Sequence, residues 1–141
     1  MENNEYKTIT VETIIAAPVE KVWEVWTSPE HITKWNHASD DWHTPYAVND
    51  LRAGGKFLSR MEARNGKVGF DFEGTYETVI KQVLIVYLLA DGRKVKVYFA
   101  GEDNNTNIVE TFEAESVHTV EQQRDGWQAI LNNFKKYTET L

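Results

Sequence analysis

The sequence predicts an α+β fold: a curved antiparallel sheet of about six to seven strands, two short helices after the first strand, and a long C-terminal helix packed across the sheet. Two patterns predict it. Residues 7–15 and most of residues 55–115 alternate apolar with polar side chains, as strands with one covered face do. Residues 16–35 and the stretch from Thr119 onward instead repeat apolar side chains at helical spacing.

The two short helices follow directly on the first strand. Pro18 suits the first position of a helix, because the N–H that proline lacks would have no partner there. Ser28 precedes Pro29 and predicts the start of a second helix, which is expected to end near Trp35. The apolar stripe of the first helix consists of Val19, Val22, Trp23 and Trp26.

A loop is expected over residues 36–48, and a turn at Gly54-Gly55 leads into the next strand. Paired glycines could also cradle a phosphate, but such a loop opens a helix, and residues 56–64 alternate as a strand. The pair is therefore predicted to form a structural turn in which at least one glycine takes a positive φ. Asp50 is expected to accept hydrogen bonds from N–H groups of that turn.

The remaining strands are separated by short turns. Asn65-Gly66 and Asp91-Gly92 are strong signals for hairpins. Between them, Gly74 predicts a bulge or a bend. Residues 83–89 are apolar on both faces, as expected of a strand that is covered on each side, and residues 107–115 form the last predicted strand.

The C-terminal helix should be about 20 residues long, which corresponds to about 30 Å. Thr119 and Gln122 have the spacing of a capping box. Gly126 is expected to permit a close approach to the helix backbone, because glycine otherwise only weakens a helix. The apolar stripe consists of Trp127, Ile130, Leu131, Phe134 and Tyr137. Such a helix, laid across a curved sheet, is expected to leave a cavity between the two.

Composition excludes several classes of protein. With 15 basic and 22 acidic residues the net charge is −7, which disfavours nucleic-acid binding through phosphate neutralisation. The absence of cysteine excludes disulfides and cysteine-ligated metals. The polar N-terminal segment is unlike a signal peptide, and no apolar stretch approaches the roughly 20 residues that span a bilayer. We therefore expect a cytoplasmic protein that binds no nucleic acid and does not insert into a membrane.

Five segments, in their order and spacing, resemble the START-like, helix-grip superfamily (SRPBCC, Bet v 1-like). They are "APVEKVWEVWTSPEHITKW", "DLRAGGKF", "FEGTYETV", "VLIVYLL" and "RDGWQAILNNFKKY". Within the superfamily the chain is most similar, from Ile9 to Tyr137, to the homologues of the activator of Hsp90 ATPase. The resemblance implies one START-like domain over residues 1–141, with a cavity between sheet and helix. The superfamily includes lipid carriers, plant allergens, polyketide cyclases and chaperone activators, so the fold leaves function open.

Aromatic and apolar side chains of the strands and of the last helix are candidates for a cavity wall. They could equally form a solid core, because in such a fold one face serves both purposes. Phe70 and Phe72 alternate with Asp71 and Glu73, and we expect the phenylalanines to face the cavity and the acids to face solvent. The candidate ligand-binding residues are Trp42, Phe57, Met61, Phe70, Phe72, Tyr87, Phe99, Trp127, Ile130 and Phe134.

Histidines and carboxylates gather after the predicted second helix. His31, His37 and His43, together with Asp40 and Asp41, have side chains that zinc binds. No two of these histidines have i, i+4 spacing on a predicted helix, so solvated loop side chains are the simpler interpretation. We predict no metal site, no cofactor and no catalytic residues.

The sequence therefore predicts a non-enzymatic protein that binds a small hydrophobic or amphipathic molecule in a cavity, in a stress-related role. A first alternative is a chaperone-interacting protein similar to the Hsp90 ATPase activator, whose partner would be a chaperone or another protein. A second alternative is an enzyme similar to polyketide cyclases and aromatases. We expect a monomer or a weak dimer, and the sequence does not specify the ligand.

Overall fold

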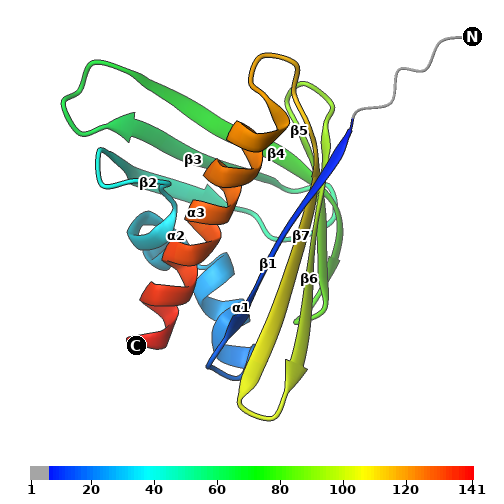
Figure 1. Ribbon diagram of the computed structural model, residues 1–141. Coiled ribbons are helices and arrows are strands. Elements are labelled where there is room, and N and C mark those ends of the chain that lie inside the picture. The colour runs from blue at the N-terminus through cyan, green and yellow to red at the C-terminus, as the bar shows by residue number, and fades with distance from the viewer. Residues whose placement is uncertain (1–6) are drawn as a thin grey trace, which may run out of the picture.

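The computed structural model describes residues 7–141 and consists of a seven-stranded antiparallel sheet and three helices (Figure 1). Residues 1–6, which begin the polar segment that we predict is not a signal peptide, lie outside the described part. The elements, in chain order, are β1 (Thr8–Ile15), α1 (Val19–Thr27), α2 (Pro29–Trp35), β2 (Trp42–Asn49), β3 (Lys56–Ala63), β4 (Gly69–Ile80), β5 (Leu84–Leu89), β6 (Lys94–Glu102), β7 (Asn105–Glu113) and α3 (Val120–Glu139).

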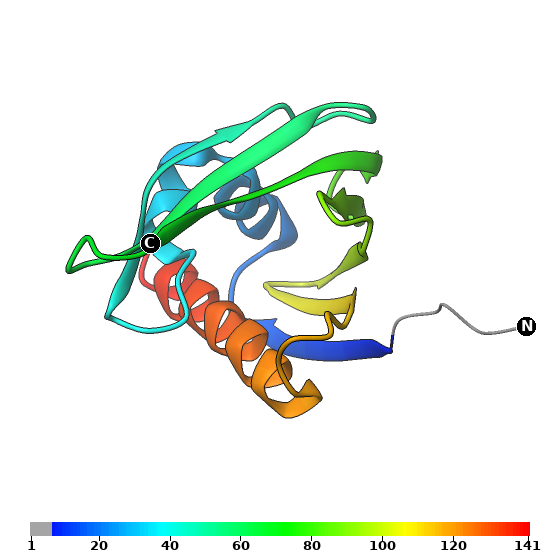
Figure 2. The ribbon, with the colours of Figure 1, turned by 90° about the horizontal axis from the view of Figure 1, so that it is seen from above.

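The strands are ordered β1-β7-β6-β5-β4-β3-β2 across the sheet, so β1 and β2 form its two edges. The sheet curls around α3, which lies on its concave side (Figure 2). Helices α1 and α2 connect the two edges and close one end of the curled sheet (Figure 1). The predicted fold class is confirmed: two short helices follow the first strand, and a long C-terminal helix covers an antiparallel sheet.

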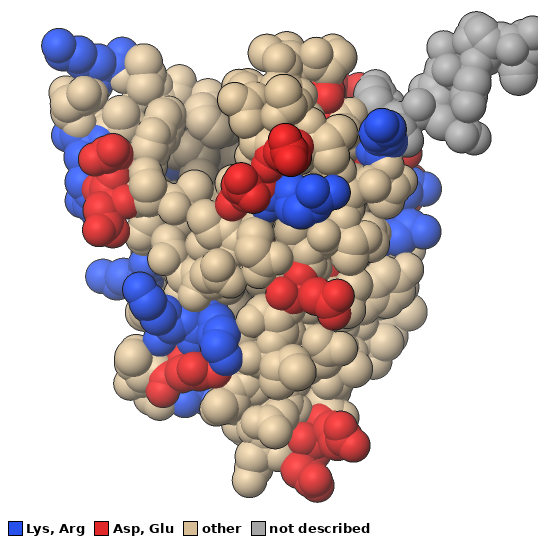
Figure 3. All heavy atoms as spheres, viewed as in Figure 1, with Lys and Arg blue, Asp and Glu red and all other residues tan. Residues whose placement is uncertain are grey.

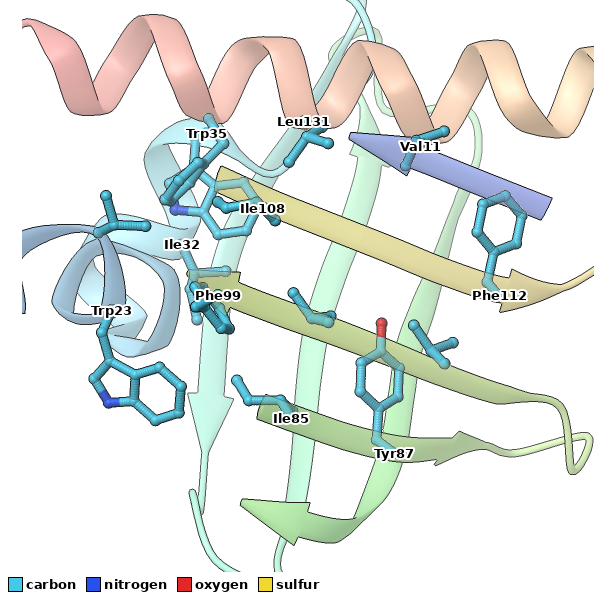
Figure 4. Close-up of a cluster of buried hydrophobic side chains, with 14 of the residues drawn as sticks. Val11, Trp23, Ile32, Trp35, Ile85, Tyr87, Phe99, Ile108, Phe112 and Leu131 are labelled. Carbon is cyan, nitrogen blue, oxygen red and sulfur yellow. The ribbon is translucent and has the colours of Figure 1, made fainter. Parts of the chain in front are cut away.

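The core lies between the concave face and the helices. On β1, Ile9, Val11 and Ile15 are buried, as the alternation of the sequence predicts. β7 pairs with β1 in register, so that Ile9 lies opposite Phe112, which is 1% exposed. Figure 4 shows such side chains converging from β1, β5, β6 and β7 toward the helices.

The prediction of a loop over residues 36–48 is wrong for most of its length, because Trp42–Asn49 form strand β2. The sequence signal was masked by Pro45, which cannot donate a hydrogen bond within a sheet. β2 tolerates this proline because it is an edge strand, and its pairing with β3 shifts register between His43 and Tyr46.

The turns and caps agree with the sequence in most respects. Gly54 takes a φ of 84°, so the Gly-Gly pair forms the predicted structural turn. Thr119 and Gln122 form the predicted capping box at the start of α3. Two details are corrected. The Ser28 side chain makes no capping hydrogen bond. Asp50 accepts the predicted hydrogen bond from a turn N–H, that of Arg52 at 2.9 Å, but through its backbone carbonyl; its carboxylate instead accepts from the Arg52 guanidinium.

Two further glycines have roles that differ from those predicted. The irregularity expected at Gly74 lies further along β4, between Tyr76 and Thr78. A Cβ at Gly74 would come within 2.8 Å of the Phe57 ring, so Gly74 allows that ring to approach the strand. Gly126, where a close approach was expected, has no atom within 4 Å of the position that a Cβ would take. Within the described part of the chain, no helix is both long and apolar enough to cross a membrane.

Candidate ligand-binding cavity

A cavity of about 220 Å³ lies between the concave face of the sheet and the helices. Its wall contains three residues of α1 and α2, namely Trp26, Ile32 and Trp35, which the sequence prediction did not include. Seven of the ten predicted ligand-binding residues line it: Phe57, Met61, Phe70, Phe72, Tyr87, Trp127 and Ile130.

The other three predicted residues do not line the cavity. Trp42, on β2, packs edge to face against Phe70 at a ring distance of 6.0 Å. Phe99 and Phe134 are 4% and 0% exposed and belong to a cluster of aromatic side chains at the α1–α2 end. Figure 4 shows Phe99 of this cluster near Trp23 and Trp35. This packed cluster consists of Trp23, Trp26, Trp35, Phe99 and Phe134.

The packed cluster is a solid core. Trp26 lies 5.0 Å from Trp35 and 4.9 Å from Phe134, measured between ring centroids. The buried indole N–H of Trp35 donates to the carbonyl of Val25 at 3.0 Å, which satisfies its polar atom. Trp26 and Trp35 thus belong to the core on one side and to the cavity wall on the other.

The cavity wall itself is built from aromatic rings in mutual contact. Phe57 lies 4.8 Å from Tyr87 and 5.3 Å from Tyr76, in edge-to-face and tilted arrangements. Trp127 projects from α3 and stacks on Phe112 of β7, with 3.9 Å between centroids and an angle of 10° between the planes. These contacts hold the rings in place around the empty volume.

The cavity opens beside the β3–β4 hairpin. Phe70 lines the cavity near this hairpin and is 50% exposed. Figure 3 shows the surface hollowed between the hairpin and the N-terminal half of α3. The predicted orientation of the neighbouring acids is confirmed: Asp71 and Glu73 are exposed, and Asp71 pairs with Arg60 at 3.2 Å.

Two polar groups of the wall satisfy each other. The Tyr76 hydroxyl donates to the side-chain oxygen of Asn49 at 2.6 Å, and the Asn49 amide donates to the carbonyl of Thr27 at 2.7 Å. Burial raises the pKa of the Tyr76 hydroxyl, so it keeps its proton at neutral pH. This chain of hydrogen bonds ties β4 to β2 and to the end of α1.

Glu110 is the one carboxyl group of the cavity wall, and sequence reasoning missed it. The residue is 6% exposed, and its strand neighbours on the two sides are Val11 and Val97. Burial raises the pKa of Glu110 to about 8. The alternation of β7 could have revealed it, because Ile108, Glu110 and Phe112 share the inner face.

The residues considered as metal ligands do not converge on one point, and several have other partners. His31 forms a hydrogen bond with the Tyr137 hydroxyl at 2.7 Å, and His43 lies 3.8 Å from a carboxylate oxygen of Glu62. Burial and the charge of Arg64 lower the pKa of His37. Residues 7–141 contain no group of three or more side chains that could hold a metal ion.

A curled antiparallel sheet that grips a C-terminal helix, with a cavity between them, defines a protein of the helix-grip class. The family model described as Activator of Hsp90 ATPase homolog 1-like protein matches residues 16–139, and the chain belongs to this family. None of the curated proteins matches the sequence.

Solved structures agree with this assignment. An AHSA1-like protein from Aeromonas hydrophila is 45% identical, with a TM-score of 0.89 over 95% of this chain and 93% of that one. A protein from Cytophaga hutchinsonii is 50% identical, with a TM-score of 0.82 over 94% and 92% of the two chains. A protein from Chromobacterium violaceum, 19% identical over 94% and 98%, shares the fold with a TM-score of 0.84.

Proposed function

We propose that this protein binds a small, largely apolar molecule in the cavity between the sheet and α3. The observation that carries the proposal is the cavity itself, whose wall is formed mainly by aromatic and aliphatic side chains. Ligand sites in proteins are typically concave and apolar, with a few polar groups that orient the ligand. The hydroxyl of Tyr76 and the carboxyl of Glu110 are polar groups of this kind.

The size of the cavity indicates the size of the ligand. An apolar cavity of about 150 Å³ accepts benzene in another protein. At about 220 Å³ this cavity has room for a molecule of one or two rings, and its open side allows a substituent to reach solvent. A long alkyl chain would extend well beyond the enclosed volume.

The test is calorimetric titration of the intact protein with 2-naphthylmethanol, a neutral bicyclic probe. We expect saturable binding at micromolar Kd, which corresponds to about −8 kcal/mol. Ser59 lines the cavity and is 5% exposed, so Ser59→Phe should fill the space and weaken binding at least tenfold.

The neighbouring residue supplies the control. Leu58 does not line the cavity, because successive side chains of a strand point to opposite faces, and Leu58→Phe should leave the affinity unchanged. Equal loss of binding in both variants, or no saturable binding by the unmodified protein, would refute the proposal.

A second candidate function rests on the family match. The family is described by its likeness to an activator of the Hsp90 ATPase, so interaction with a chaperone is the alternative. It predicts that an Hsp90 chaperone changes the NMR spectrum of this protein, whereas 2-naphthylmethanol does not. The aromatic cavity favours the small-molecule function, because a surface that only binds a protein has no need of an enclosed volume.

A further inference from the structure

The Glu110 carboxyl is a largely buried polar group that borders the cavity. Burial alone shifts its pKa, with no contribution from a hydrogen bond or a charged neighbour within residues 7–141, although the residue is only 6% exposed. Its oxygens are not among the fully buried atoms that lack a partner, so they remain accessible from the cavity. Its neighbours across the strands, Val11 and Val97, are apolar. Buried carboxyl groups are normally paired or hydrogen-bonded, because an unpaired one is costly. A group that accepts this cost and borders a cavity is a candidate for contact with a ligand.

The cavity wall contains no compensating positive charge. No lysine, arginine or histidine side chain lines it, and Glu110 is its only acidic residue. A ligand carboxylate would therefore be buried without a cation and beside a second acid. A ligand ammonium group would instead find the one side chain that can neutralise it.

The rings around the cavity favour the same kind of ligand. Trp127, Tyr87 and Phe57 present aromatic surfaces to the cavity, and the faces of such rings attract cations. Tyr87 rises from β5 with its hydroxyl directed toward β6 and β7, the strand that carries Glu110 (Figure 4). Its oxygen can accept a hydrogen bond from an N–H group bound beside Glu110.

We propose that the natural ligand is a small aromatic amine, whose ammonium group pairs with Glu110 while its ring packs among Phe57, Phe72 and Trp127. This inference rests on the proposed function and names the chemical class of ligand for the same cavity. Glu110 lies on β7, whereas the opening lies beside β4. In the sheet order β4 is three strands away from β7. The amine group would therefore enter first and the ring would follow.

Binding of such an amine changes the protonation of the site. In the empty cavity burial holds the pKa of Glu110 at about 8, so at pH 7 the carboxyl carries its proton. The amine arrives as an ammonium ion. In the complex the carboxyl is ionised, and the proton that it held goes to the buffer. Close to one proton is therefore released for each amine bound.

Few other ionisable groups face Glu110. Tyr87 of β5 is close enough to interact with it electrostatically, and burial and the Glu110 charge both raise the pKa of the Tyr87 hydroxyl, so it stays neutral. Tyr76 of β4 is likewise protonated. The facing residues of the other elements are Val11 of β1, Val97 of β6, and Trp127 and Ile130 of α3, which do not titrate.

Three probes of one shape separate the possible ligands: 2-naphthylmethylamine, 2-naphthylmethanol and 2-naphthoic acid. Calorimetry on the intact protein at pH 7 should show the amine binding at least tenfold more tightly than the alcohol, and the acid at least tenfold more weakly. Titrations in two buffers of different ionisation enthalpy should show proton release with the amine and none with the alcohol. The affinity for the amine should rise about tenfold per pH unit from pH 6 toward pH 8.

Two variants assign the preference to Glu110. Glu110→Gln keeps the shape of the side chain and removes its ability to ionise, so the amine should lose its tenfold advantage while the alcohol binds as before. Glu73→Gln makes the same substitution on the exposed face of β4 and should leave all three affinities unchanged. The proton-release measurement needs no variant and stands if Glu110→Gln fails to fold.

The outcomes distinguish the two proposals. If the alcohol binds and the amine binds no better, the inference about amines is wrong and the cavity function stands. If the amine is preferred equally in the Glu110→Gln variant, Glu110 is not the partner and the inference is also wrong. If none of the three probes binds, the proposed function itself fails.

Discussion

The two ends of the concave face use the same kinds of residue to different effect. At the α1–α2 end, the packed cluster joins three tryptophans and two phenylalanines in direct contact, and Phe134 is fully buried within it. At the other end, Phe57, Phe72 and Trp127 surround a cavity. Helices α1 and α2 make the difference, because they supply Trp26 and Trp35 to fill the space between sheet and α3. At the other end neither α1 nor α2 reaches into the space between sheet and α3, so the aromatic side chains there line a cavity.

The largest expected effect comes from truncating one aromatic residue at each end. Phe134→Ala should destabilise the protein by about 3–5 kcal/mol, because it opens a void within a solid core. Trp127→Ala should cost about 2 kcal/mol, since Trp127 is only partly buried and already borders a cavity. Urea unfolding measures both. If Trp127→Ala costs as much as Phe134→Ala, the two ends are packed alike and the comparison fails.

The next effect concerns the ionisation of Glu110, which lies at the cavity end. In the folded protein the pKa of Glu110 is raised from its ordinary 4.5 to about 8. Between these pH values the folded state binds more protons than the unfolded state, so stability falls as pH rises and levels off above about pH 8. Glu110→Gln removes this loss and should be more stable than the unmodified protein at pH 8, by on the order of 4 kcal/mol.

Urea unfolding at pH 4 and at pH 8 tests this prediction. At pH 4 Glu110 is protonated in the folded state and mostly protonated in the unfolded state, so the variant and the unmodified protein should differ little. Glu73→Gln, on an exposed face, controls for the change in net charge. An unchanged difference between the two proteins at the two pH values would show that Glu110 is not buried as described.

The smallest effect comes from two glycines near the cavity. Gly126→Ala should stabilise α3 by about 0.5–1 kcal/mol, because alanine favours a helix and its Cβ would meet nothing within 4 Å. Gly74→Ala should destabilise by about 1–3 kcal/mol, because its Cβ would lie 2.6 Å from the Leu88 carbonyl oxygen and 2.8 Å from the Phe57 ring. Thermal unfolding gives the sign of each. Loss of stability in Gly126→Ala would indicate a contact at this point of the helix.

The local rules of sequence predicted most of the fold. The alternation in residues 7–15, the glycine turns and the capping box at Thr119 each have a short-range physical cause, and each agrees with the structure. The strand Trp42–Asn49 was not predicted, because Pro45 indicates a loop. Proline is acceptable in this strand only because the strand lies at the edge of the sheet.

The candidate site was less predictable, because it depends on where three elements meet. The sequence gives Phe57 and Phe134 the same apolar character, and only the packing of α1 and α2 decides which one borders a void. Glu110 was missed for a related reason. An acid within a strand usually faces solvent, and its inward orientation follows from the register of β7 against β1 and β6.

Methyl NMR during a titration with 2-naphthylmethanol tests the central claim most directly, which is that one end is hollow and the other is solid. Ile85 and Ile130 line the cavity, whereas Val22 and Val25 are buried beside the packed cluster and do not line it. Shifts and probe contacts confined to the first pair, with saturation at micromolar concentration, are the predicted result. Equal shifts in both pairs, or no shifts at millimolar probe, would contradict the division of the molecule into a solid end and a hollow one.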